Sequence, residues 1–394
     1  MRRFLLAWLY IEAILGEVTI SSRRRKLDEV TQGNGLSDAY TATLTRLKTQ
    51  KGSRSRLGLE ALMWVQYAER PLRAKELCHA LGVETGSTDL DPENVPALRT
   101  ILGCSLGLLT VETSSSTVRL VHSTLQEHFV NDPTLFHNPH SAIAEVCLTY
   151  LNFQCVWSLS PALYSAPAEM PLLEYASCYW IEHTRKGIAG EVKTLALQLL
   201  SRFDGHISAN LLLLRHNKDR GSGPSLDWME RRTGFTGLHA AAILGIPGVV
   251  AAVLEMKEWD VNVLDCMRST ALTWAAREGH EEVVKALLER NDVYPDPVDS
   301  SGRTPLSWAA ETGCEGAVKA LLEREDVNPD LVDSSGRTPL LWAASRRHER
   351  VVKLFLERRY FVPDRVPLIS LRIAVDGCFL IIALFFLSHI FTIA

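Results

Sequence analysis

The sequence lacks the features that mark secreted or zinc-stapled proteins. Its eight cysteines include no C-x-x-C pair, and no N-x-S/T sequon occurs in the 394 residues. Cysteines scattered through apolar runs are typical of packed thiols in a reducing compartment, and no cysteine spacing suits a zinc site. We therefore expect a cytoplasmic protein with no metal ion and no cofactor.

The chain also has little excess charge of either sign. Its formal net charge is −4 and 22% of its residues are charged, so there is no overall attraction to nucleic acid. Nor does any Gly-Lys pair occur, which excludes the phosphate-binding G-x-x-x-x-G-K-[ST] loop from these residues. At this length, the chain can form two or three domains, each with its own core.

A 34-residue repeat dominates the second half of the sequence. The hexapeptide S-G-R-T-P-L occurs at 301–306 and at 335–340, and leucines in register occur at 238 and 272. Thr304 and Thr338 suit the N-cap of a helix, and the prolines after them suit its first turn. This pattern resembles the ankyrin repeat and predicts a solenoid of four helix-turn-helix units over 233–359.

Glycines mark the end of the first helix in three of these units. Gly245, Gly279 and Gly313 occupy the position where a left-handed residue ends a helix. Arg347 stands there in the fourth unit, and Arg268 replaces the hairpin glycine of the second. We therefore expect looser units at these two places.

Residues 36–132 predict a different fold. Helical patterns at 57–67, 73–81 and 96–106 precede two short β-rich runs at 108–112 and 118–121, and a helix at 123–130 follows. This order of elements is that of a winged helix. Further helical patterns indicate a helical linker domain over 140–217, so the whole protein is predicted to be mainly α.

Several segments resemble one family. The runs M-W-V at 63–65, E-R-P-L at 69–72, E-L-C-H-A-L at 76–81 and V-R-L-V-H-S-T-L-Q-E-H at 118–128 are similar to the winged helix of fungal NACHT–ankyrin proteins. These are signalling NTPases of the STAND class, similar to NLR immune receptors. Residues 1–20 resemble the end of the NACHT module, although the apolar run at 4–15 also fits a core helix or a signal peptide. The resemblance implies a signalling protein, here without its NTPase loop.

The resemblance also draws attention to His122. It matches a histidine that contacts the bound nucleotide in complete members of the family. Because the phosphate-binding loop is missing from this sequence, we expect His122 to be a packing residue or a relic, and we expect no binding of ATP or GTP.

Two short segments suggest functions other than protein binding. The run G-C-S-L-G at 103–107 matches the G-x-S-x-G elbow of hydrolases, but that elbow follows a strand and opens a helix, and the predicted order here is the reverse. DNA binding through 73–81 would use Arg73, Lys75 and His79, yet Glu76 lies among them. We expect no catalytic residue and no small-molecule substrate. A winged-helix nucleic-acid-binding protein regulated through its ankyrin repeats remains the alternative function.

The tail at 360–394 departs from the repeat. Residues 378–394 contain no Asp, Glu, Lys or Arg, and as a helix they would be about 25 Å long, slightly less than the hydrocarbon core of a membrane. Arginines upstream fit a cytosolic flank. The pattern suits a membrane anchor, a cap on the last repeat or an altered coding sequence, and we favour the anchor.

The main function predicted is a non-catalytic protein–protein interaction module. In an ankyrin solenoid the hairpin tips and the outer side of each first helix form a concave surface for another protein. Arg303 and Arg337 are expected to contribute most, unless they only brace the hairpins through Asp299 and Asp333. The predicted protein-binding residues are Cys266, Met267, Ser269, Arg277, Glu278, Ser300, Ser301, Arg303, Glu311, Thr312, Ser334, Ser335, Arg337, Ser345 and Arg346.

Overall fold

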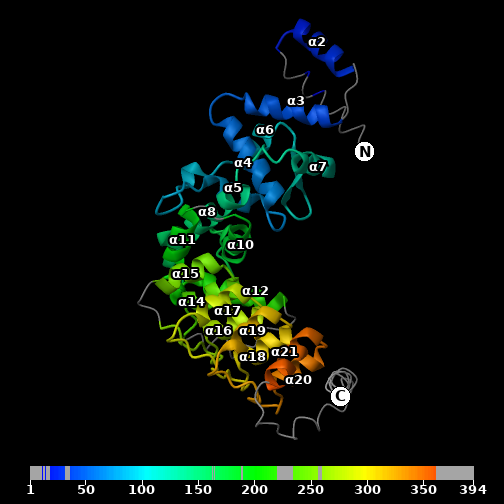
Figure 1. Cartoon of the computed structure of the whole chain (residues 1–394). Coiled ribbons are helices and arrows are strands. Elements are labelled where there is room, and N and C mark those ends of the chain that lie inside the picture. Colours follow the sequence, from blue (N-terminus) through cyan, green and yellow to red (C-terminus); the bar gives the residue numbers. More distant parts are fainter. Residues whose placement is uncertain are drawn as a thin grey trace, which may run out of the picture. The chain divides into compact units, whose positions relative to one another are not determined.

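The computed structural model describes residues 11, 14, 18–31, 36–161, 163, 165–187, 190–219, 234–255 and 260–360. These residues are mainly helical (Figure 1), which confirms the predicted fold class. The chain divides into two compact units, Met1–Leu195 with Asn210–Leu212 and Ala196–Ala209 with Leu213–Ala394. The apolar segment 378–394 and most of the predicted helix at 4–15 lie outside the described residues.

The first unit contains a winged helix preceded by α2 (Ile20–Thr31). The helices α3 (Leu36–Lys48), α4 (Arg54–Tyr67), α5 (Ala74–Gly82) and α6 (Leu98–Cys104) come before the hairpin of β1 (Leu109–Glu112) and β2 (Thr117–Leu120), and α7 (Ser123–Asn131) follows. The strands pair antiparallel, with Leu109 opposite Leu120. Leu62, Leu77 and Phe129 are fully buried in its core. The predicted order of elements is present, and α3 is an additional helix that the sequence patterns did not indicate.

More helices complete the first unit and lead into the second. They are α8 (Pro139–Leu151), α9 (Gln154–Trp157), α10 (Leu173–Lys186), α11 (Gly190–Leu200) and α12 (Ile207–Asp219), with the 3₁₀ turns η1 (Pro92–Asn94) and η2 (Phe203–Gly205). The helices α8 and α10 pack closely against each other. Their contact buries Ile143, Leu148 and Tyr175, because both helices carry an apolar face.

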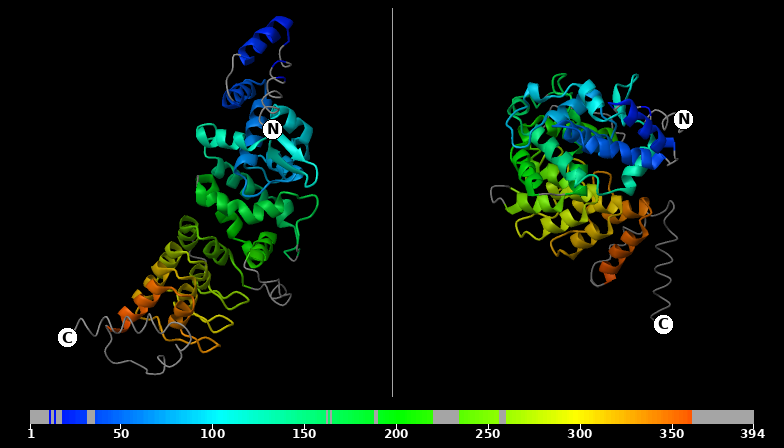
Figure 2. Two further views of the ribbon diagram at one scale, coloured as in Figure 1. Left: turned by 90° about the vertical axis from the view of Figure 1, so that its right-hand side faces the viewer. Right: turned by 90° about the horizontal axis from the view of Figure 1, so that it is seen from above.

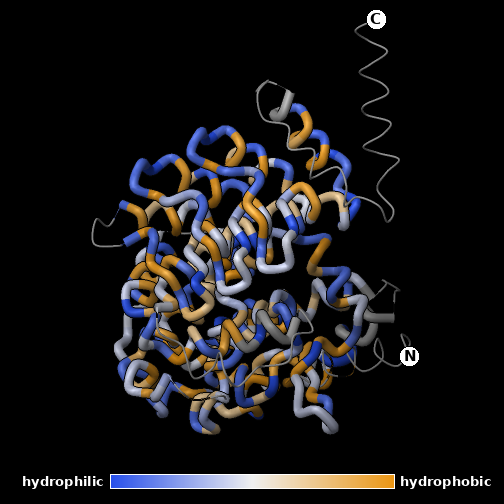
Figure 3. The backbone as a smooth tube through the Cα atoms, turned by 90° about the horizontal axis from the view of Figure 1, so that it is seen from below, coloured by the Kyte–Doolittle hydropathy of each residue, from blue (hydrophilic) through white to orange (hydrophobic). Residues whose placement is uncertain are grey.

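The described part of the second unit contains four helix pairs. They are α14 (Gly237–Leu244) with α15 (Pro247–Glu255), α16 (Ala271–Glu278) with α17 (Glu281–Leu288), α18 (Pro305–Thr312) with α19 (Glu315–Glu323), and α20 (Pro339–Ser345) with α21 (Glu349–Tyr360). Figure 2 shows the pairs lying side by side in sequence order, from yellow-green to orange. Hydrophobic and hydrophilic residues alternate along these helices (Figure 3), so that each pair buries its apolar face against its neighbours.

The repeat signature forms the local geometry that its residues favour. Thr304 caps α18 by accepting a hydrogen bond from the Ser307 amide at 3.2 Å, and Thr338 caps α20 in the same way. Gly245, Gly279 and Gly313 have φ of 61°, 75° and 76°. Arg347 keeps this conformation with φ of 60°, as Arg268 does in its hairpin with φ of 58°. The backbone therefore imposes the left-handed geometry even where an arginine has to adopt it at a cost.

The second unit includes residues that precede the four predicted repeats at 233–359. Residues 196–209 belong to it, and the Phe203 ring lies 6.4 Å from the ring of Phe235, which directly precedes the first helix pair. The Leu200 carbonyl lies so close to Gly237 that a Cβ there would collide with it. The predicted linker domain at 140–217 is therefore divided between the two units.

No helix in the described part of the chain is both long enough and apolar enough to cross a membrane. Because the apolar segment 378–394 lies outside that part, the predicted anchor is not tested by this finding.

Candidate functional site

The hairpins between the helix pairs are held by one buried aspartate each. Oδ1 of Asp299 accepts the amides of Ser301 and Arg303 at 2.8 and 2.9 Å, and its Oδ2 accepts the indole N–H of Trp308 at 2.9 Å. Asp265 and Asp333 make the equivalent three bonds in their own hairpins, including those to Trp274 and Trp342. Hydrogen bonds between neighbouring hairpins join them, from the Ser300 amide to the Met267 carbonyl and from the Ser334 amide to the Ser301 carbonyl. The hairpins therefore form a rigid, regularly spaced surface.

Arginines and tryptophans alternate beneath this surface. The Arg277 guanidinium lies 4.9 Å from the Trp274 ring and 4.6 Å from the Trp308 ring. The Arg303 guanidinium lies 3.6 Å from Trp308 and 4.0 Å from Trp342, and Arg337 is 4.8 Å from Trp342. Each stacked pair contributes on the order of 0.5–2 kcal/mol, so the alternation ties each repeat to the next.

A half-buried glutamate that pairs with one buried and one exposed arginine adds to this link between the third and fourth helix pairs. The Glu311 carboxylate accepts hydrogen bonds from Arg303 and Arg346, each at 2.5 Å. Burial alone would raise the pKa of Glu311, but the bonds from Arg346 and Arg303 outweigh it and hold the pKa below its ordinary value. Glu311 therefore stays ionised and acts as a structural link.

The predicted protein-binding residues fall into three groups. Ser269 and Arg303 are buried, with 3% and 7% of their surface exposed, so neither can act as a surface contact. Four residues are half-buried: Cys266, Arg277, Glu278 and Glu311. Two of them, Arg277 and Glu311, make the contacts just described. The exposed residues are Met267, Ser300, Ser301, Thr312, Ser334, Ser335, Arg337, Ser345 and Arg346.

The structure changes the roles expected of Arg303 and Arg337. Both were expected to be surface contacts or else braces through Asp299 and Asp333. In the structure these aspartates bind the backbone amides of the two arginines, and the Arg303 guanidinium binds Glu311 instead. Arg303 is therefore an internal brace, and of the two only Arg337 is exposed.

Sequence reasoning missed an apolar stripe on the hairpins. Leu264, Val298 and Val332 are 41%, 42% and 57% exposed, and Met267 lies exposed near the first of them. The three aliphatic residues recur at the 34-residue spacing, each one position before its buried aspartate. That spacing could have revealed them, because a large apolar residue held at an exposed position in successive repeats is unusual for a solvated turn. We call Leu264, Met267, Arg268, Val298, Val332 and Arg337 the hairpin face.

The winged helix shows little that fits DNA readout. Glu76, in the middle of the predicted recognition helix, is buried, pairs with Arg70 through two 2.8 Å bonds and accepts the Arg73 amide. On the wing, Arg119 is paired with Glu112 at 2.9 Å. Lys75 and the Arg73 side chain are exposed, but two cations make a small surface for a phosphate backbone.

The two enzyme-like signals have structural explanations. Ser105 follows α6, is fully buried and donates a hydrogen bond from Oγ to the Leu102 carbonyl at 2.8 Å. It ends a helix before a strand, and this is the reverse of a hydrolase elbow. His122 is the N-cap of α7, where Nδ1 accepts the Thr124 amide at 3.2 Å. This is the local packing role expected for it.

Two family models match the chain. A model described as "Ankyrin repeats (3 copies)" matches residues 197–297 and 291–365. A model described as "GPI inositol-deacylase, winged helix domain" matches residues 46–144. No curated protein matches the sequence. The chain thus contains ankyrin repeats and a winged-helix domain of the GPI-inositol-deacylase type, and ankyrin repeats are protein-interaction domains.

Proposed function

We propose that this protein is a non-catalytic scaffold or sensor part of a STAND signalling protein of the NACHT–ankyrin type, whose ankyrin repeats bind another protein. Two features support the proposal. A winged helix of a type associated with NACHT modules comes before ankyrin repeats in one chain. The hairpin face also presents a regular apolar stripe on a rigid frame, and this observation carries the interaction proposal. No binding or hydrolysis of nucleotide is expected from the chain alone.

The chemistry of the hairpin face indicates the kind of partner. Its apolar stripe is flanked by the exposed cations Arg268 and Arg337. A complementary protein segment would place apolar side chains on Val298 and Val332 and carboxylates near the arginines. Such contacts would bury aliphatic surface at the centre and leave the charges at the rim, where they steer association.

The experiment uses the full chain as bait and then measures the affinity of the captured protein for variants. Val298→Asp with Val332→Asp should weaken binding at least tenfold and leave the unfolding temperature unchanged, because both side chains are exposed. Val130→Asp is the matched control, since Val130 is 68% exposed on the winged helix. Arg337→Ala should weaken binding, whereas Arg303→Ala should lower stability. Equal binding by the double variant and by the wild type would remove the hairpin face from the proposal.

We also propose that residues 378–394 anchor the protein at a membrane, with the rest of the chain in the cytoplasm. The support is the uncharged run itself, since moving its large apolar side chains into lipid would gain about 1.5–3 kcal/mol each. A fusion of residues 360–394 to a soluble reporter should partition with membranes and resist alkaline carbonate. Leu384→Arg should release it. A fusion that stays soluble would leave a cytoplasmic protein without an anchor.

A further inference from the structure

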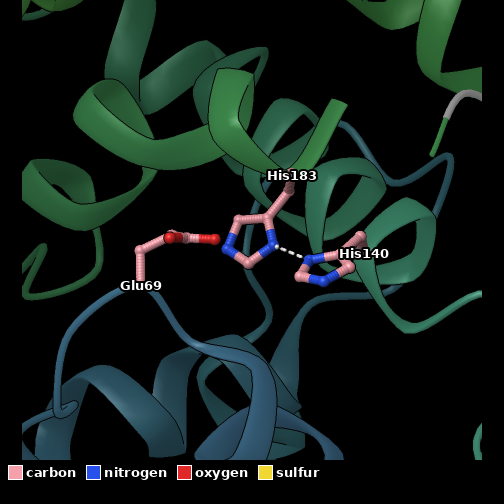
Figure 4. Close-up of side chains that lie close together, drawn as sticks. All are labelled: Glu69, His140 and His183. Carbon is pink, nitrogen blue, oxygen red and sulfur yellow. Dashed lines mark hydrogen bonds between the residues drawn. The ribbon is translucent and has the colours of Figure 1, made fainter. Parts of the chain in front are cut away.

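Three residues that are far apart in the sequence come together in the first unit. Glu69 lies in the segment between α4 and α5, His140 in the first turn of α8 and His183 in α10. One ligand atom of each residue lies within 4.8 Å of the other two. Figure 4 shows the His183 ring between the Glu69 carboxylate and the His140 ring. Two imidazoles and one carboxylate are a ligand set that divalent transition metals favour.

The two imidazoles face each other through their Nδ1 atoms. Nδ1 of His140 lies 2.9 Å from Nδ1 of His183, so without an ion one ring has to donate its proton to the other. Two nitrogens that bind one tetrahedral zinc at about 2.1 Å lie about 3.4 Å apart. An ion can therefore replace the shared proton with a small movement of the rings.

The surroundings hold His183 as metal-binding proteins hold their ligands. Its Nε2 lies 2.9 Å from the Tyr175 hydroxyl, and that hydroxyl accepts the Glu69 amide at 3.1 Å. The Tyr67 ring packs edge-on against His140, with centroids 5.4 Å apart. A hydrogen bond to the second ring nitrogen, such as the one from His183 to Tyr175, fixes the orientation of a ligating imidazole and raises its basicity.

The two imidazoles differ in their access to solvent. His183 is fully buried, whereas His140 is half-buried, so an ion and its water ligand would enter from the His140 side.

Glu69 has to move toward the histidines for the site to close. Its side chain is 22% exposed and pairs with Lys186 through Oε1 at 2.6 Å. The His183 ring lies between its carboxylate and His140 (Figure 4), so the carboxylate has to leave Lys186 and pass the edge of that ring to reach the ion. Lys186, which is 49% exposed, is then the competing cation. Removing its charge should favour metal binding.

We propose that Glu69, His140 and His183 form a zinc site that ties the α4–α5 segment to α8 and α10. The ion replaces the proton between the two Nδ1 atoms, the Glu69 carboxylate supplies the third ligand and water completes a tetrahedron. The site would stabilise the first unit. No local spacing in the sequence indicates this site, because the three ligands come from three separate segments.

The test is a titration of the full chain, stripped with a chelator, with zinc and with cobalt(II). We expect one zinc per chain, a raised unfolding temperature, and cobalt d–d bands without a thiolate charge-transfer band. The absence of the thiolate band would distinguish this site from binding by the cysteines. His140→Ala and Glu69→Gln should weaken zinc binding at least tenfold, and Lys186→Met should tighten it. His137→Ala is the control, because His137 is exposed and three residues from His140.

Two results would overturn the proposal. Zinc binding that is the same in wild type, His140→Ala and Glu69→Gln would place the ion elsewhere. No binding by a chain that remains folded would leave a hydrogen-bond chain from the Glu69 amide through Tyr175 and His183 to His140. The unfolding temperature of each metal-free variant shows whether a loss of binding reflects unfolding.

Discussion

Asp299 is a buried carboxylate whose position depends on three donors rather than on a cation. Only 7% of its surface is exposed, so its charge has to be stabilised by the two amides and the indole that it binds. The same arrangement at Asp265 and Asp333 makes these three side chains the residues on which the hairpin face depends.

Replacing Asp299 with asparagine should expose this dependence. The amide oxygen of Asn can still accept the amides of Ser301 and Arg303, but its NH₂ group would then meet the Trp308 N–H, donor against donor. We expect a loss of about 1.5–3 kcal/mol of unfolding free energy, the usual range for a hydrogen bond to a charged group. Urea unfolding of the full chain measures it.

A double-mutant cycle supplies the control for this prediction. Trp308→Phe removes the indole donor and keeps the ring, so Asp299→Asn should cost clearly less in that background. An equal cost in both backgrounds would show that the indole bond contributes nothing and that only the backbone amides matter.

Side-chain roles were the part of the site that the sequence could not determine. Arg303 and Arg337 lie in identical hexapeptides, yet one is buried and the other is exposed. The difference arises because Trp342 of the next repeat covers Arg303, whereas no described residue of a further repeat covers Arg337. Local sequence fixes the hairpin, but the neighbouring repeat decides which side chain remains accessible.

At the scale of helices and turns, the sequence predicts the structure well where a repeated local signal exists. The four helix pairs follow from the T-x-L signal at the start of each pair and from glycine signals, because caps and left-handed residues act locally. The winged-helix order follows from alternating patterns around a Ser/Thr-rich turn. The helix α3 was missed because its residues, L-S-D-A-Y-T-A-T-L-T-R-L-K, include four threonines and serines that favour other structures.

The link between the third and fourth helix pairs should be sensitive to acid. Because the pKa of Glu311 is lowered in the folded protein, its contribution is complete above the unfolded value of about 4.3 and is lost as the pH falls through the folded pKa. Glu311→Gln should cost about 1–3 kcal/mol at pH 7 and flatten the change in unfolding temperature between pH 6 and about pH 3.

Glu323→Gln provides the comparison, since Glu323 is an exposed glutamate on α19 whose ion pair with the exposed Lys319 is 3.9 Å long. It should leave both the stability and its pH dependence nearly unchanged. If the two variants show the same pH profile, the Glu311 ion pair does not contribute to the acid sensitivity of the repeats.

At the scale of the whole molecule, the 34-residue period does not predict the boundary between the two units. Residues 196–209 carry no T-P-L signal, yet they belong to the ankyrin unit. Their apolar side chains act as a cap, because a solenoid has to cover the exposed core of its first repeat. A cap needs apolar side chains that fit the end of the stack, but it does not need the repeat motif. The 34-residue period therefore does not predict where the cap begins.

This cap can be tested by comparing two fragments, 196–360 and 233–360. Leu199, Leu200 and Phe203 are at most 1% exposed, and the Phe203 ring packs near Phe235. Removing them exposes the first helix pair, at a cost of about 1.5–3 kcal/mol for each large side chain that had packed there.

The longer fragment should unfold cooperatively in urea, and the shorter one should unfold at a clearly lower urea concentration or begin with its first pair unfolded. Tryptophan fluorescence reports the transition through Trp274, which lies 6.3 Å from the Phe235 ring. Equal midpoints for the two fragments would show that the repeats need no cap from residues 196–209 and that the ankyrin unit can begin at 233.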